Sequence, residues 1–169
     1  MIIKRDLEEC ERHLDRVQSF VPRVDTRVSA LFAISSAQAA VAALNLQVFD
    51  LTIWWIGLPA ALYFFTLAWT LWHLYWCTHP TLKGGAGSLV YFGEIAKRTE
   101  TNFIADFGGA SAEDIKRDVL AQTWRNAQIV SEKYGHLKFA SAGIAAGLFP
   151  WLAILLAATA QRGILPTFS

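Results

Sequence analysis

Residues 51–72 read LTIWWIGLPAALYFFTLAWTLW and contain no charged side chain. Two other uncharged stretches, Val28–Phe49 and Phe139–Gln161, have a similar length. A helix crosses the hydrocarbon core of a bilayer with about 20 apolar residues. Each stretch is long enough, so the sequence predicts an integral membrane protein with three spans rather than a soluble enzyme.

The composition and the placement of charge agree with this prediction. Hydrophobic residues make up 54% of the 169 residues and charged residues 17%, against about 45–50% and about 25% in soluble domains. Of the 15 Lys and Arg residues, six precede Val28, eight lie from Lys83 to Lys138, and one follows Phe139. Because positive residues mark cytoplasmic segments, we expect a cytoplasmic N-terminus and an external C-terminus. The net charge of +1 gives no indication of DNA or RNA binding.

These patterns predict an all-α integral membrane protein with five parts. They are a cytosolic amphipathic helix in residues 1–24, a hairpin of two transmembrane helices in 25–78, a helical cytosolic insert in 79–136, a third transmembrane helix in 137–161 and an external tail in 162–169. Tryptophans at both ends of the second span fit the two membrane interfaces, where indole rings are enriched. Pro59 and Pro150 predict a bend in the second and in the third span.

The N-terminal segment has apolar residues at alternating spacings of four and three, which is a heptad pattern. They are Ile3, Leu7, Cys10, Leu14, Val17, Val21 and Val24. Such a helix can pack on its own chain or associate with a second copy, and three heptads are short for an independent coiled coil. Pro22 predicts a bend between this helix and the first span.

Small and polar residues in the spans indicate where helices approach closely. The first span is rich in alanine and carries Gln38 near its middle, which can hydrogen-bond to a neighbouring helix or line a polar path. The third span contains Gly143 and Gly147, a G-x-x-x-G pair typical of tight helix crossings. We favour a helix-packing role for all three residues.

The insert begins with a glycine-rich loop at 83–87 and continues with apolar residues at helical spacing. This spacing predicts a helix over Ser88–Phe107, ended by the glycine pair that follows. Ser111, followed closely by two acidic residues, is typical of a helix N-cap. Because no strong breaker comes after it, we expect one long helix over residues 112–161, leading from the cytosol into the third span.

The chain carries few residues that could do chemistry. Its four histidines are scattered along the sequence and form no metal-site motif. The glycine-rich loop lacks the G-x-x-x-x-G-K-[ST] pattern of a phosphate loop and is typical of a linker. Cys10 and Cys77 are expected to be reduced in the cytosol. We therefore expect no catalytic residue, no bound metal and no cofactor.

The predicted long helix carries basic and aromatic residues that could bind a nucleotide. Basic side chains hold a phosphate, and aromatic rings stack on a base. The candidate ligand-binding residues are Arg117, Trp124, Arg125, Lys133 and Tyr134. The same side chains could instead form a solvated surface facing lipid headgroups, so the pattern alone leaves both interpretations open.

Short motifs follow one another along the chain in a recognisable order. Val24-Asp25-Thr26-Arg27 precedes the first span, Tyr91-Phe92-Gly93-Glu94-Ile95-Ala96 and Gln122 lie in the insert, and Ala127-x-x-Val130-Ser131-Glu132-Lys133-Tyr134-x-x-Leu137 precedes the last span. This series resembles the membrane effectors of the bacterial Pycsar anti-phage system, with Arg27 where that family has lysine in an Asp-Thr-Lys stretch. The resemblance extends from about Val24 to Leu156.

The resemblance implies a function. In such systems a separate cyclase makes cCMP or cUMP during phage infection, and the membrane effector responds with loss of membrane integrity. It implies a multi-pass protein of the bacterial inner membrane that binds a cyclic pyrimidine mononucleotide. We expect a homo-oligomer, because the insert is too small and too helical for a standard cyclic-nucleotide-binding β-roll, and a site between subunits is then economical. A different class stays open, a membrane-anchored scaffold whose N-terminal helix recruits a partner without sensing a ligand.

Overall fold

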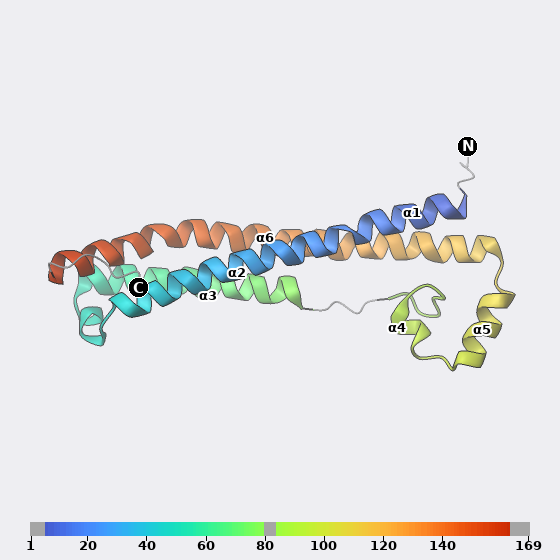
Figure 1. Ribbon diagram of the computed structural model, residues 1–169, viewed down its shortest axis with the longest axis horizontal. Helices are drawn as coiled ribbons and strands as arrows, with labels where there is room; N and C mark the ends of the chain where they lie inside the picture. The colour runs from blue at the N-terminus through green and yellow to red at the C-terminus, as the bar shows by residue number, and fades with distance from the viewer. Residues whose placement is uncertain (1–5, 80–83, 163–169) are drawn as a thin grey trace. The chain divides into compact units, whose positions relative to one another are not determined.

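The computed structural model describes residues 6–79 and 84–162, and every element within them is a helix (Figure 1). In chain order these are α1 (Leu7–Gln18), α2 (Phe20–Asn45), the 3₁₀ helix η1 (Val48–Thr52), α3 (Trp54–Thr78), α4 (Phe92–Ile95), α5 (Glu100–Gly109) and α6 (Ala112–Arg162). Three helical stretches are long and apolar enough to cross a membrane: Leu7–Asn45, Trp54–Thr78 and Ala112–Gln161. The predicted all-α architecture with three membrane spans is therefore confirmed.

The chain divides into two compact units. Unit 1 takes Met1–Arg23 and Pro80–Glu132, and unit 2 takes Val24–His79 and Lys133–Ser169. The long helix α6 contributes its N-terminal part to unit 1 and its C-terminal part to unit 2. Unit 1 thus holds α1, α4, α5 and the start of α6, whereas unit 2 holds most of the apolar sequence.

In unit 1, the heptad side of α1 packs on its own chain. The core joins Cys10 and Leu14 of α1 to Val119 of α6, with Leu7, Val90 and Ile115 packed around them. The N-terminus of α1 is capped by Asp6, whose Oδ1 accepts a hydrogen bond from the Leu7 N–H at 2.8 Å. Of the two interpretations of the heptad pattern, the structure shows packing within the chain.

The interruption between α1 and α2 lies at Ser19, before the proline predicted to cause it. Ser19 ends α1, and its N–H donates to the Asp15 carbonyl at 2.9 Å. Pro22 instead lies in the first turn of α2. The first N–H groups of a helix have no helical partner, so a proline there costs no hydrogen bond.

The helix predicted over Ser88–Phe107 is wrong, because the structure has two shorter helices there. The Ser88–Tyr91 segment is not helical, and the α4 helix ends at Ile95. Thr99 then starts α5: its backbone is extended, and its Oγ1 accepts a hydrogen bond from the Asn102 N–H at 3.3 Å. A side-chain cap inside the predicted segment thus begins a new helix where apolar spacing suggested continuation.

The long helix α6 confirms the prediction made for the C-terminal third of the chain. Ser111 caps it, since its Oγ accepts a hydrogen bond from the Asp114 N–H at 3.2 Å and donates one to the Asp114 carboxylate at 2.6 Å. The helix then continues for 51 residues and includes Pro150. The bends predicted at the prolines of the spans stay predictions.

In unit 2, α2, α3 and the C-terminal part of α6 pack together around two apolar clusters. The first contains Val24, Val28, Leu74, Cys77, Leu137 and Ala140. The second contains Ala42, Ala60, Tyr63 and Ile154. The order of these residues along each helix shows that α3 runs antiparallel to the other two.

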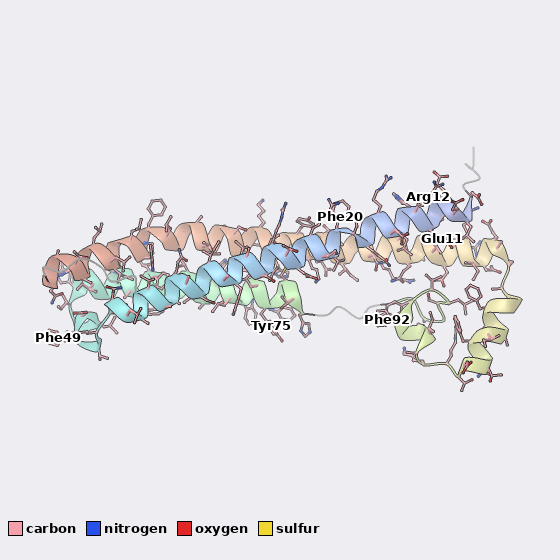
Figure 2. The ribbon with its side chains drawn as sticks, viewed as in Figure 1. Glu11, Arg12, Phe20, Phe49, Tyr75 and Phe92 are labelled. Atoms are coloured by element: carbon pink, nitrogen blue, oxygen red, sulfur yellow. The ribbon has the colours of Figure 1, made fainter. Side chains whose placement is uncertain are left out.

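Large apolar side chains cover the outside of unit 2. Leu62 and Phe65 of α3 are 52% and 68% exposed, and Leu156 of α6 is 70% exposed. Figure 2 shows two more of these outward-facing side chains, Phe49 of η1 and Tyr75 of α3. Water-soluble monomers rarely expose so much apolar surface, whereas lipid tails accept it and the helices satisfy their own backbone. The exterior of unit 2 is therefore a lipid-facing surface.

Candidate functional site

The glycine-rich segment Gly84–Leu89, called here the glycine loop, is fastened to α6 in unit 1 by Asp118. One carboxylate oxygen, Oδ2, accepts hydrogen bonds from the Ser88 hydroxyl at 2.9 Å, the Leu89 N–H at 2.7 Å and the Val90 N–H at 3.1 Å. Ser88 Oγ in turn accepts from the Tyr91 N–H at 2.9 Å. The loop is thus a fixed structure, because side-chain oxygens take the hydrogen bonds that a helix would otherwise provide.

Two glycines let this loop lie directly on neighbouring side chains. A Cβ added at Gly84 would collide with the ring of Tyr91, and a Cβ added at Gly85 would collide with the guanidinium of Arg125. Gly93 is also close to the Tyr91 ring. The loop backbone therefore lies directly on one aromatic ring and one charged group, and a side chain at either glycine would displace the group beneath it.

The outer side of the loop is tied to α4 and to the residues that follow it. The Gly87 N–H donates to Glu94 Oε2 at 3.0 Å, and the Gly87 carbonyl accepts from Arg98 Nη2 at 2.7 Å. Lys97 also donates to Glu94, and this hydrogen bond, followed by the one from Gly87, holds the pKa of the Glu94 carboxyl below its ordinary value. The exposed ring of Phe92 projects from α4 beside this region (Figure 2).

Three buried polar atoms of unit 1 have no hydrogen-bond partner among the described residues. They are Nη1 of Arg98, Oε1 of Gln122 and Nη1 of Arg125. Gln122 is 6% exposed, and its Nε2 donates to Asn126 Oδ1 at 3.2 Å. A buried polar atom without a partner is costly, so each of these three atoms needs a partner that the described residues do not supply.

A groove of about 320 Å³ lies between the glycine loop and the first turns of α6, and none of these three side chains lines it. Arg117, Asp114 and Asp118 contribute its polar side chains, and Ala86–Leu89 form the opposite wall. Its volume is at the lower end of the range for small-molecule sites, about 300–1,000 Å³. Unit 1 therefore offers a groove with charged side chains on α6 opposite the backbone of the glycine loop.

In unit 2, an ion pair joins the start of α2 to α6. Lys133 Nζ lies 3.3 Å from Asp25 Oδ1. The Cys77 thiol of α3 donates to the backbone carbonyl of the same Lys133 at 3.4 Å, so α3 also contacts this residue. All three helices of the unit therefore meet at Lys133.

The glycine pair of α6 lies against α3. A Cβ added at Gly143 would overlap the Thr70 side chain, and a Cβ added at Gly147 would overlap that of Thr66. These glycines let the two helices approach until side-chain hydroxyls of α3 touch the backbone of α6, as small residues do in lipid.

A further contact joins α2 to α6 at mid-span. The Trp151 indole Nε1 donates to the main-chain oxygen of Gln38 at 2.9 Å. The position predicted to join helices by its side chain therefore does so by its carbonyl group.

A family comparison covers nearly all of these residues. A family model described as Pycsar effector protein domain, PycTM, matches residues 9–160. The chain belongs to the Pycsar effector family. Comparisons with curated proteins and with solved structures found no match. The protein is therefore a multi-pass membrane effector of anti-phage defence, and the predicted resemblance is confirmed.

The structure of this Pycsar effector divides the five predicted ligand-binding residues between its two units. Arg117, Trp124 and Arg125 belong to unit 1, and Lys133 and Tyr134 belong to unit 2. Trp124 is exposed and Arg125 lies under the glycine loop, whereas Lys133 pairs with Asp25 and Tyr134 packs on the first apolar cluster. The two residues of unit 2 thus have structural contacts of their own.

The family-motif positions fall at contact points of the Pycsar effector. Tyr91, Gly93, Glu94 and Gln122 surround the glycine loop in unit 1. Phe92 and Arg27 are exposed, and Asp25 is the partner of Lys133.

Three contacts of the Pycsar effector could not be predicted from the sequence. Arg98 and Asp118 bind the glycine loop from positions far along the chain, and no motif marks them. The histidines that look scattered in the sequence include a pair: the Nδ1 atoms of His73 and His136 lie 2.9 Å apart, and the His73 ring stacks on Phe139. Only the antiparallel packing of α3 and α6 brings these rings together.

Proposed function

We propose that this Pycsar effector responds to a cyclic pyrimidine mononucleotide, cCMP or cUMP, and then impairs the integrity of the bacterial inner membrane. The observation that carries the proposal is the family match over residues 9–160, which covers both the lipid-facing unit and the polar unit. In this proposal the N-terminus and unit 1 are cytoplasmic, the protein acts as a homo-oligomer, and it catalyses no reaction. In this proposal unit 1 senses the ligand, because it holds the groove beside the glycine loop and three buried polar atoms without a partner among the described residues.

The helix α6 supports a route from sensing to membrane damage. It continues for 51 residues from the Ser111 cap, past the glycine loop and into the last span. A shift of its N-terminal part on ligand binding would be carried along one continuous helix, since a helix can couple two sites.

The scaffold alternative requires α1 to present its apolar side to another protein. Within unit 1, Cys10 and Leu14 are 1% and 7% exposed and pack on Val119 of the same chain. That side of the helix is therefore already covered, which favours the effector over the scaffold.

The experiment compares bacteria that express the effector with and without a pyrimidine nucleotide cyclase, using a membrane-potential dye. We expect depolarisation only when effector and active cyclase are present together. A cyclase inactivated by mutation is the matched control. Depolarisation without cyclase, or none with it, would contradict the proposed response.

Calorimetry separates sensing from damage. Titration of cCMP and of cUMP into the detergent-solubilised protein is expected to release or absorb heat with at least one of them, and not with cAMP or cGMP. Absence of heat with every cyclic mononucleotide would remove ligand sensing while leaving the membrane role to be tested by the dye.

A further inference from the structure

We propose that Arg125, under the glycine loop of unit 1, binds the phosphate of the ligand, and that Gln122 binds the edge of its base. This inference rests on the proposed function and deepens it by assigning the site. It places recognition within one chain, in contrast to the site between subunits that the small size of the insert suggested.

The charge of Arg125 lacks a partner among the residues that the structure describes. A guanidinium is always protonated in proteins, and Arg125 has no carboxylate partner in the part of the chain that the structure describes. Its Nη1 is buried without an acceptor, and the glycine loop covers the group at Gly85. Covering a charge without a partner is costly, and an anion is the partner that a guanidinium binds best, through short charge-assisted hydrogen bonds.

Gln122 lies one turn before Arg125 on α6. Residues three apart lie on the same face of a helix, so Gln122 and Arg125 point to the same side of α6. The amide nitrogen of Gln122 is engaged by Asn126, and its oxygen is left without a partner at 6% exposure. A buried amide oxygen accepts a hydrogen bond, and both pyrimidines offer one on the base edge, cytosine from its amino group and uracil from its ring N–H.

Arg98 contacts the same loop from the chain segment before α5. Its Nη2 donates to the Gly87 carbonyl at 2.7 Å, and its Nη1 is buried without a partner among the described residues. Asp106 lies 3.6 Å from its Nε and neutralises part of its charge. Arg98 therefore holds the loop and adds one donor, while Arg125 carries the uncompensated charge.

The competing explanation is that Arg125 only supports the loop. A supporting role predicts that removal of the charge loosens unit 1 without changing ligand affinity in the folded protein. A binding role predicts a loss of affinity at unchanged fold, and protection of the Arg125 side chain when ligand is present. These outcomes differ, so one set of measurements separates them.

The experiment titrates cCMP and cUMP into the detergent-solubilised full-length protein by calorimetry. Arg125→Gln is expected to weaken binding about tenfold to a hundredfold, and Gln122→Leu about twofold to tenfold, from the usual strengths of charged and neutral hydrogen bonds. The matched control is Lys116→Gln on the same helix, which loses one charge and an exposed pair with Glu113; its affinity should stay within about twofold of wild type. Circular dichroism checks that each variant is folded.

A measurement on the unmodified protein keeps the test decisive if a variant does not fold. Phenylglyoxal modifies accessible arginines, and peptide mass spectrometry locates the product. Saturating ligand is expected to protect Arg125 and to leave Arg12, which is exposed on α1 (Figure 2), as reactive as before. Equal affinity of folded Arg125→Gln and wild type, or no protection of Arg125, would overturn this site while wild-type binding still upheld the proposed function. No binding by wild type would overturn both.

Discussion

At the scale of single residues, Asp118 fastens the glycine loop of unit 1 with one oxygen atom. Asp118→Asn would leave one neutral amide oxygen in place of the carboxylate. Either the amide NH₂ group would face the three donors of Ser88, Leu89 and Val90, or these donors would share a weaker acceptor. We expect a loss of about 1.5–3 kcal/mol in the local stability of the loop, the usual value of hydrogen bonds to a charged group. Hydrogen exchange at the amides of Leu89 and Val90 should then be more than about tenfold faster.

The control for this prediction is Glu113→Gln, which removes a carboxylate from the same helix but loses only an exposed pair with Lys116. Its loop amides should exchange at the wild-type rate. Unchanged exchange in Asp118→Asn would mean that the loop is held by other contacts.

Glu94 makes one edge of the glycine loop sensitive to acid. Its hydrogen bonds from Lys97 and Gly87 lower its pKa in the folded protein. A carboxyl whose pKa is lower when folded stabilises the fold above its unfolded pKa, and that contribution is lost as the pH falls through the lowered value. We expect exchange of the Gly87 amide, corrected for its intrinsic rate, to accelerate as the pH falls below the ordinary pKa of a glutamate, and to lose this acceleration in Glu94→Gln. An identical pH profile in the variant would contradict the assignment.

The sequence predicts the role of a residue well when its contacts are with near neighbours in the chain, and poorly when they are with distant segments. Ser111 could be recognised as a cap, since the residues it needs follow within one turn. Asp118 and Arg98 could not, because each contacts a loop that many residues of chain separate from it. The covered Nη1 atom of Arg125 could not be predicted for the same reason: the glycine that covers the guanidinium belongs to a segment that looked like a linker.

At the scale of helices, the close crossing of α6 on α3 depends on two glycines of α6, Gly143 and Gly147. Gly143→Leu or Gly147→Leu would force α6 away from Thr70 or Thr66. We expect each variant to lose about 1–3 kcal/mol of stability, as overpacking typically costs, and to lose cyclase-dependent depolarisation. Thermal unfolding of the solubilised protein and the potential dye provide the two measurements.

Gly135 supplies the matched control, because a Cβ added there meets nothing within 4 Å. Gly135→Ala should be neutral or stabilising by up to about 1 kcal/mol, since alanine favours a helix more than glycine does. Wild-type behaviour in both leucine variants would show that the close approach is dispensable.

Helix boundaries show the limit of periodicity as a guide. The pattern predicted α6 well, because fifty residues of consistent spacing leave no competing interpretation. It joined α4 and α5 wrongly, because the apolar residues on both sides of Thr99 keep the same spacing while the threonine side chain caps a new helix. A single polar cap was enough to override the pattern.

At the scale of the whole molecule, the proposed route through α6 predicts sensitivity to helical phase. One alanine inserted between Glu132 and Lys133, where one unit ends and the other begins, rotates all later residues by about 100°. Seven inserted residues restore the phase to within about 20°. We expect the single insertion to abolish depolarisation while calorimetric ligand binding persists, and the seven-residue insertion to recover part of the response. Equal activity of both variants would exclude transmission by rotation of this helix.

The chain has two cysteines, and the division into units gives one to each: Cys10 and Cys77, free and 1% and 0% exposed. Neither thiol can react with a reagent until its own surroundings open. The reactivity of each thiol therefore reports on the opening of one unit, Cys10 on unit 1 and Cys77 on unit 2. The order in which the two thiols become reactive after addition of nucleotide would tell which unit opens first.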